Sequence, residues 1–307
     1  SSDLGLQNST YNIYYGDVML SFDKTFAEKH NVMANVGWNA REEEYYLSSV
    51  GTSQGLTQEN WFNLAASVGT KGASMGRQSL LRTGMFGTLR YGFDNWAYLE
   101  GTLRQEKTST LKKGNNSFWY PSVSGSFIFT EMMKDARPTW WDFGKIRASY
   151  GIVGNAPEIY RAVNAFNQGT LLKDNSYTYN YIGTSVGNES IRPEKKHELE
   201  FGLESKFFHN RLGFEASFYS NTIKDQILQT TSAYAMGAQS MLMNVGELSN
   251  KGFEFAAYGT LVETKDFRWD LRANIAFNKN KVNKLADGLE VLSHGTFDSG
   301  AASLESH

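Results

Sequence analysis

Hydrophobic and polar residues alternate one by one along much of the chain, most clearly in residues 198–219. One set of alternate positions is apolar: Leu199, Phe201, Leu203 and Phe207. The other set is charged: Glu198, Glu200, Glu204 and Lys206. Strand side chains point to opposite faces in turn, whereas a helix would mix the two sets. The alternation resumes after residues 208–211, which predicts a hairpin with a very short turn, and Asn210 tolerates the left-handed conformation of such a turn.

Comparable runs predict about ten strands. Residues 253–261 and 267–277 flank the short join "ETKD", residues 85–103 form another hairpin, and weaker runs occupy 14–26, 30–42, 118–130 and 142–153. Many runs reach the nine to eleven residues of a membrane-spanning strand, about twice the usual length in soluble proteins. Short joins also alternate with long ones at about 42–83, 105–118, 153–196 and 223–250.

Alternating short and long joins are typical of an up-and-down antiparallel barrel in an outer membrane, because all turns at one rim are short. We therefore predict an all-β, antiparallel transmembrane β-barrel. Its apolar face meets outer-membrane lipid, and its charged face lines a water-filled lumen. The lumen-facing residues expected from the two clearest hairpins are Glu198, Glu200, Glu204, Arg268, Asp270 and Arg272.

A soluble or surface-attached β-rich carbohydrate-binding module is the alternative. Such a module must bury Phe214, Phe218, Trp269 and Phe277 against a second sheet, whereas a membrane barrel exposes them to lipid. A ten-stranded barrel enzyme would need acids and histidines gathered at one rim, and the sequence does not supply that set.

Composition narrows the chemistry. The chain has no cysteine, which excludes disulfides, thiolate metal sites and cysteine nucleophiles, and its formal net charge of −2 does not favour nucleic acid as a partner. No apolar run is long enough for a transmembrane helix, and a mean hydropathy of −0.45 is compatible with a barrel. The five histidines, at positions 30, 197, 209, 294 and 307, are scattered, so we expect no metal site and no cofactor.

Three segments resemble the barrel of SusC/RagA-type TonB-dependent transporters of Bacteroidetes. They are "RASYGIVGNAPEI" (147–159), "RPEKKHELEFGLESKFFHNRLGFEASFYSNTIKDQIL" (192–228) and "NVGELSNKGFEF" (244–255). Residues 93–106 and 120–129 look like neighbouring strands of the same barrel, so the resemblance covers about 80–285.

This resemblance implies TonB-dependent import of oligosaccharides or peptides across the outer membrane of a Gram-negative bacterium. It also implies a SusD-like surface lipoprotein as lid and a TonB complex acting through a missing N-terminal part. We expect residues 1–307 to be part of a 22-stranded barrel with long extracellular loops at about 42–83, 153–196 and 223–250 and no plug domain.

Aromatic residues are the candidates for substrate contact. Tyr177, Tyr179 and Tyr181 alternate in one long loop, and Trp61 and Phe62 lie in another. Flat aromatic faces stack on sugar rings, although barrels also carry aromatic girdles at the membrane interfaces. Glu198, Glu200 and Glu204 are spaced as acid/base pairs can be, but a solvated lumen wall explains them more simply. We therefore expect binding and translocation without covalent chemistry, and no enzyme.

Overall fold

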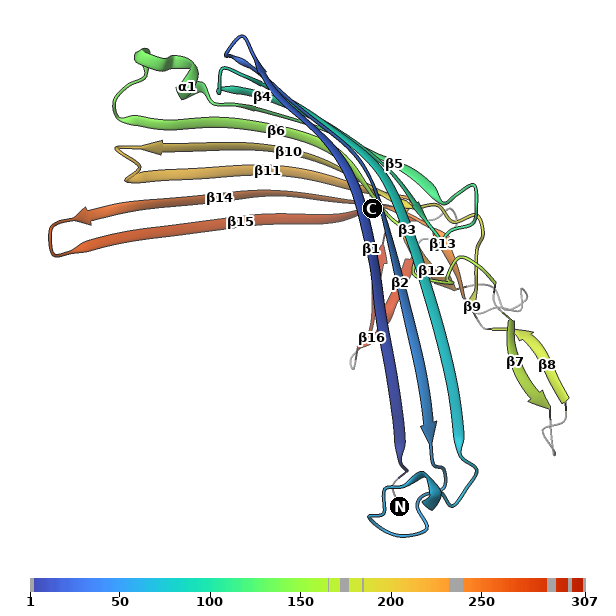
Figure 1. Cartoon of the computed structure of the whole chain (residues 1–307). Coiled ribbons are helices and arrows are strands. Elements are labelled where there is room, and N and C mark those ends of the chain that lie inside the picture. Colours follow the sequence, from blue (N-terminus) through green and yellow to red (C-terminus); the bar gives the residue numbers. More distant parts are fainter. Residues whose placement is uncertain are drawn as a thin grey trace.

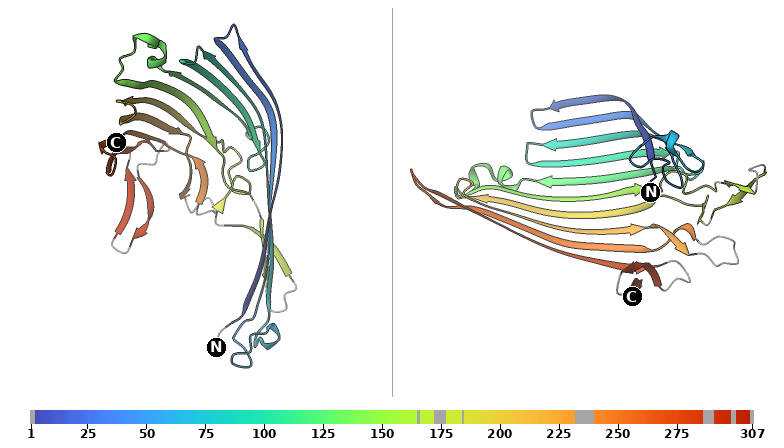
Figure 2. Two further views of the ribbon diagram at one scale, coloured as in Figure 1. Left: turned by 60° about the vertical axis from the view of Figure 1, so that its left-hand side comes forward. Right: turned by 90° about the horizontal axis from the view of Figure 1, so that it is seen from below.

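Ten strands form one antiparallel sheet in the computed structural model, which describes residues 3–164, 166–171, 177–183, 185–231, 240–285, 291–297 and 300–305. Figure 1 shows the sheet as a curved, open wall, and Figure 2 shows its arc from two further sides. In spatial order the strands are β1 (Gly5–Phe26), β2 (His30–Gly51), β3 (Gly72–Phe93), β4 (Ala97–Thr108), β5 (Ser117–Phe127), β6 (Trp141–Asn155), β10 (Glu194–Phe207), β11 (Leu212–Lys224), β14 (Glu247–Glu263) and β15 (Arg268–Lys284). The predicted all-β, antiparallel fold of about ten strands is confirmed, and within the described residues β1 and β15 are the sheet's edges.

The pairing register places apolar positions of one strand opposite apolar positions of the next, and polar or small positions opposite each other. Between β10 and β11, Phe201 lies opposite Phe218 and Gly202 opposite Ser217. The predicted turn at 208–211 is confirmed, and Asn210 has a φ of 63°. Asp142 fixes this turn, because its carboxylate accepts a hydrogen bond of 2.9 Å from the backbone N–H of Asn210.

One face of the sheet is apolar across all ten strands, and no second layer of described residues lies over it (Figure 1 and Figure 2). Phe218, Trp269 and Phe277 are 43%, 51% and 61% exposed. On β14 and β15, Phe253 lies opposite Phe277 and Phe255 opposite Ile275. These three side chains, which a soluble module would have to bury, are therefore open to the surroundings in the described structure, whereas Phe214 is half-buried between the rings of Phe207 and Phe255.

An aromatic band lies at the rim of the sheet where short connections join the strands. Trp140, Trp141, Phe207, Phe214 and Phe255 form a chain of stacked rings whose centroids lie between 5.9 and 6.2 Å apart. The join between β5 and β6 holds α1 (Phe129–Met133) and η2 (Lys134–Ala136). No helix among the described residues is long and apolar enough to cross a membrane.

The buried core lies in the long connections at the opposite rim. Residues from three connections and the start of β5 pack together there: Leu111, Phe118, Ala162, Ile191 and Leu242. Short strands accompany them: β7 (Phe166–Leu171), β8 (Tyr177–Ile182), β9 (Ser185–Val186), β12 (Ile227–Thr231) and β13 (Ser240–Asn244). A two-stranded pair, β16 (Val291–Phe297) and β17 (Gly300–Glu305), follows the sheet, and η1 (Leu64–Ala66) lies between β2 and β3.

The first predicted long loop, 42–83, is wrong in its bounds, because β2 and β3 remain paired until Gly51 meets Gly72. The connection is only 52–71. Alternation of apolar and polar residues fades in 42–51 because strand faces that are both in water have no reason to differ. The backbone ladder needs no such pattern, so the strands continue where the sequence signal stops.

Candidate functional site: the polar face of the sheet

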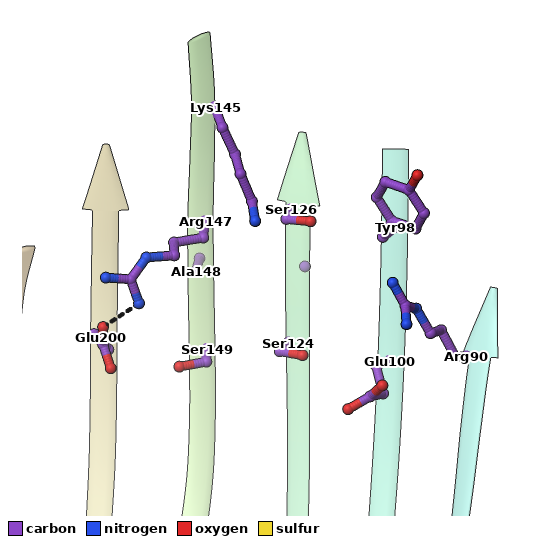
Figure 3. A pocket seen from close by; sticks show the side chains of 11 residues that line it. Arg90, Tyr98, Glu100, Ser124, Ser126, Lys145, Arg147, Ala148, Ser149 and Glu200 are labelled. Carbon is purple, nitrogen blue, oxygen red and sulfur yellow. Dashed lines mark hydrogen bonds and ion pairs between the residues drawn. The ribbon is translucent and has the colours of Figure 1, made fainter. Parts of the chain in front are cut away.

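The second face of the sheet is polar and forms a groove of about 360 Å³ across five neighbouring strands. Figure 3 shows the side chains of β3, β4, β5, β6 and β10 that reach into it. Its polar lining residues are Arg90, Tyr98, Glu100, Ser124, Ser126, Lys145, Arg147, Ser149 and Glu200. Cations, carboxylates and hydroxyls are thus close together on a surface that is largely open.

Arg147 is the central group of this groove. Its guanidinium donates to Glu200 on β10, and on β11 it donates to Glu215 at 3.1 Å and to the Ser217 hydroxyl at 2.8 Å. The side chain crosses β10 above Gly202, where an added Cβ would lie 2.3 Å from the Arg147 Nε. Glycine at this position therefore leaves the space through which Arg147 links three strands.

A second groove of about 410 Å³ continues the polar face toward β15. Its acidic residues are Glu198, Glu200, Glu215 and Glu254. Arg147 lines both grooves, so it lies between the cations at 90 and 145 and a row of carboxylates. Lys145 forms no ion pair with any residue that the structure describes.

All six residues predicted to face the lumen lie on this polar face. The register places Arg272 opposite Tyr258 and Asp270 opposite Thr260, on the side of Glu254. They are not gathered into one cluster. Three of them pair locally, Glu198 with Lys196 at 2.9 Å, Glu204 with Lys206 at 3.1 Å and Asp270 with Arg268 at 2.9 Å, whereas Glu200 pairs with Arg147 of β6.

The aromatic candidates lie in two different connections. Trp61 and Phe62, 47% and 63% exposed, belong to the 52–71 connection, while Tyr179 and Tyr181 belong to β8. Tyr179 and Tyr181 are both exposed, and their ring centroids are 5.6 Å apart. Tyr177 begins β8, but its side chain is outside the described part of the chain, as are the side chain of His294 and all of His307.

Sequence reasoning did not single out Arg147 and Lys145. Both lie in the weaker run at 142–153, where lysine, arginine and serine occupy alternate positions 145, 147 and 149. That spacing could have identified a polar face. The contact with Glu215 could not have been found, because β6 and β11 are separated by β10.

The three segments that resemble the transporter family supply hydrogen bonds at the points where the long connections leave the sheet. The Asn155 amide donates to one oxygen of Glu194 at 2.9 Å, and the other oxygen accepts from the Ile227 N–H at 3.2 Å. Asn244 accepts from the Arg192 N–H at 2.8 Å and donates to the carbonyls of Arg192 and Asp225 at 2.7 and 2.8 Å. These contacts fix how the connections leave the sheet.

Among the described residues there is no group of three or more histidines and carboxylates placed to hold a metal ion. Charged and hydroxyl groups along an open wall can form exchangeable hydrogen bonds with a polar solute, and water competes for each of them. Such a surface holds solutes weakly and lets them move.

Residues 1–299 match the family model described as TonB dependent receptor-like, beta-barrel. TonB-dependent receptor P3 of Formosa agariphila is 27% identical over 275 residues, which cover 88% of this chain and 27% of that protein. TonB-dependent receptor SusC of Bacteroides thetaiotaomicron is 28% identical over 212 residues, which cover 66% of this chain and 21% of that protein.

The fold agrees with these matches. The structure of the RagAB peptide transporter superposes with a TM-score of 0.83 at 23% identity, covering 97% of this chain and 34% of that one. The chain thus spans about a fifth to a third of the length of these relatives. Barrels of this kind lie in the outer membrane of Gram-negative bacteria, and the chain belongs to the TonB-dependent receptor-like β-barrel family.

Proposed function

We propose that this chain is part of the wall of an outer-membrane transporter that imports nutrient oligosaccharides or peptides by a TonB-dependent route. The observation that carries the proposal is the division of one ten-stranded sheet into an uncovered apolar face and a continuous polar face. The apolar face can contact lipid, and the polar face can be hydrated by a water-filled lumen.

In this proposal the residues around Arg147 line the lumen. Glu198, Glu200, Glu204, Arg268, Asp270 and Arg272 belong to the same wall and keep the passing substrate hydrated. Local ion pairs supply most of their charge balance, so no single group holds substrate tightly. Tyr179 and Tyr181 present adjacent exposed rings that would stack on a sugar or an aromatic side chain.

Two partners follow from the same proposal. A SusD-like surface lipoprotein covers the long connections from outside, and the TonB complex acts from the periplasm through a part of the receptor beyond this chain. The name RagAB peptide transporter supports a peptide as substrate, and the resemblance to SusC/RagA-type transporters keeps an oligosaccharide equally open. Transport of either needs no covalent step, so no enzymatic activity is proposed.

The carbohydrate-binding module does not fit the apolar face. A soluble protein exposing side chains such as Trp269 and Phe277 over a whole sheet face would bury them by association. In the membrane barrel the same exposure needs no partner protein.

Whole-cell uptake tests the proposal. The full receptor is expressed in a strain that lacks its own copy, and uptake of labelled neutral oligosaccharides and of short peptides is measured with and without a protonophore. We expect protonophore-sensitive uptake of one class, and its loss in the double variant E198L/E200L with unchanged barrel assembly.

The matched control is A257L/A273L. It also introduces two leucines, at directly opposite positions of β14 and β15, but on the apolar face. Unchanged uptake in E198L/E200L would count against a substrate path along this wall, and uptake that ignores the protonophore would count against TonB coupling.

A further inference from the structure

Basic residues gather on the apolar side of the sheet, immediately beyond its last hydrophobic row. The register places Lys251 opposite Lys279 one step after Phe253 opposite Phe277. On the neighbouring strands Lys195 lies opposite Lys224. The lysine patch, as we call it, consists of Lys195, Lys224, Lys251, Lys279 and Lys281, all of them exposed.

The patch lies at the depth of lipid headgroups if the apolar face meets lipid, as the proposed function has it. Ten residue steps separate Phe267, at the short-turn rim, from Phe277. At about 3.3 Å per residue and a tilt of about 40°, this apolar stretch is about 25 Å tall, the height of a barrel's hydrophobic band. Lys279 is the next side chain on that face, so it lies where the outer leaflet's headgroups begin.

The patch keeps an excess of positive charge among the described residues, although the carboxylate of Glu247 lies on the same face at the position opposite Lys224. None of its five lysines forms an ion pair with a described carboxylate. The nearby acid on this face, Glu247, is hydrogen-bonded to the Asn283 amide at 3.1 Å. By contrast, Arg77 on the same face of β3 pairs with Glu44 of β2 at 2.9 Å.

Two pairs of like charges directly opposite each other are unfavourable in a sheet unless an anion lies between them. The Lys195–Lys224 and Lys251–Lys279 pairs occupy adjacent strand pairs, and the neutral groups between them can hydrogen-bond to an anion. Those groups are the hydroxyls of Ser220, Thr222 and Ser249 and the ring of His197, whose Nδ1 is 2.8 Å from the Tyr150 hydroxyl.

We propose that the lysine patch binds the phosphate groups of an outer-leaflet lipid. Charge complementarity identifies the anion, and continuity with the hydrophobic band identifies the lipid as its carrier. The acyl chains lie along rings such as Phe253 and Phe277 while the phosphates rest among the ammonium groups above them. The patch thereby fixes the depth and the lipid surroundings of this side of the barrel.

Lipid binding to the purified full-length receptor in detergent tests this inference. The probe is a glycolipid with a bis-phosphorylated disaccharide head, compared with the same lipid after removal of its phosphates, and bound lipid is counted by native mass spectrometry. One lysine near a charged headgroup contributes about a fivefold change in affinity. We therefore expect K251Q/K279Q to bind the phosphorylated lipid about 25-fold more weakly.

The control variant K24Q/K265Q removes the same charge from the opposite rim and should bind within about twofold of the wild type, since salt screens so distant a charge. Without lipid, K251Q/K279Q should melt at a higher temperature than the wild type, because a repulsion is gone. Equal affinity for the dephosphorylated lipid, or unchanged binding by K251Q/K279Q, would overturn the inference.

Inorganic phosphate is tested as a competitor of the lipid. If it displaces the lipid at comparable concentration, the patch binds free phosphate and the lipid assignment is wrong. Substrate uptake is measured on the wild type and on the same variants, so unchanged lipid binding by K251Q/K279Q, with uptake as proposed, rejects this inference alone and leaves the proposed function standing.

Discussion

Gly202 is the residue over which Arg147 reaches Glu215 and Ser217, and Gly202→Ala tests whether that reach matters. The new Cβ would lie 2.3 Å from Nε and 2.8 Å from Cγ of Arg147. Real Cβ atoms do not approach so closely, so the arginine side chain has to leave its position. The substitution thus removes contacts made by another residue without changing any charge.

The expected magnitude follows from those contacts. Arg147 is 40% exposed, and its partners Glu200 and Glu215 are 31% and 54% exposed, so each ion pair is screened and contributes about 0.2–1 kcal/mol. With the hydrogen bond to Ser217, the loss amounts to about 1–2 kcal/mol. Alanine in a strand in turn gains about 0.5–1 kcal/mol over glycine. The net destabilisation should be about 0.5–1 kcal/mol.

The sharper result is a change of sign. In an Arg147→Gln background the contacts are already gone, so Gly202→Ala should stabilise the barrel by about 0.5–1 kcal/mol. Urea unfolding of the full receptor in detergent, followed by tryptophan fluorescence, measures all four proteins of this cycle. Lys145→Gln, on the same strand and face but without an ion pair, is the control and should change stability little. If Gly202→Ala has the same effect with and without Arg147, the reasoning is refuted.

Three further predictions concern other parts of the chain. Asn244→Ala removes three hydrogen bonds at the bases of two connections, so protease should cut these connections faster in intact cells, whereas Asn180→Ala in exposed β8 should not change the cutting rate. The Lys134 ammonium, 3.1 Å from the Asp94 carboxylate, lowers the pKa of that turn residue, so its stabilisation is present at neutral pH and is lost as pH falls through the acid range. The melting temperatures of wild type and Asp94→Asn should accordingly differ at pH 7 and converge as the pH is lowered below the ordinary titration range of aspartate, and a constant difference would contradict this. The double variant Y179A/Y181A should weaken binding of an oligosaccharide about tenfold if the two rings stack on it, and unchanged affinity by calorimetry would exclude that contact.

Much of the fold could be predicted because the two sides of the sheet have different surroundings. Where one face is apolar and the other polar, as in 198–219, hydrophobic and polar residues alternate in the sequence. The sequence also predicts the left-handed conformation of Asn210 in the turn of that hairpin. The signal ends where both faces are wet. The ends of β2 and β3 were missed for that reason, although backbone pairing carries them on to Gly51 and Gly72.

The sequence predicts which residues lie on the polar face, but it does not predict which of them contact one another. Alternation alone placed Glu198 and Glu200 on one side of their strand. It could not show that Arg147 reaches Glu215 across an intervening strand, because that contact depends on strand order and on the absence of a side chain at Gly202. The lysine patch needed the register between four strands for the same reason.

The length of β1, β2 and β3 has an evolutionary consequence. Each has 22 residues, about twice what a bilayer needs, so the wall extends beyond the membrane as paired strand. A single inserted residue would turn every side chain beyond it to the opposite face, whereas two residues added to each partner strand preserve the faces. Insertions and deletions among relatives should therefore come in even numbers on this side of the barrel and in any number within the 52–71 connection.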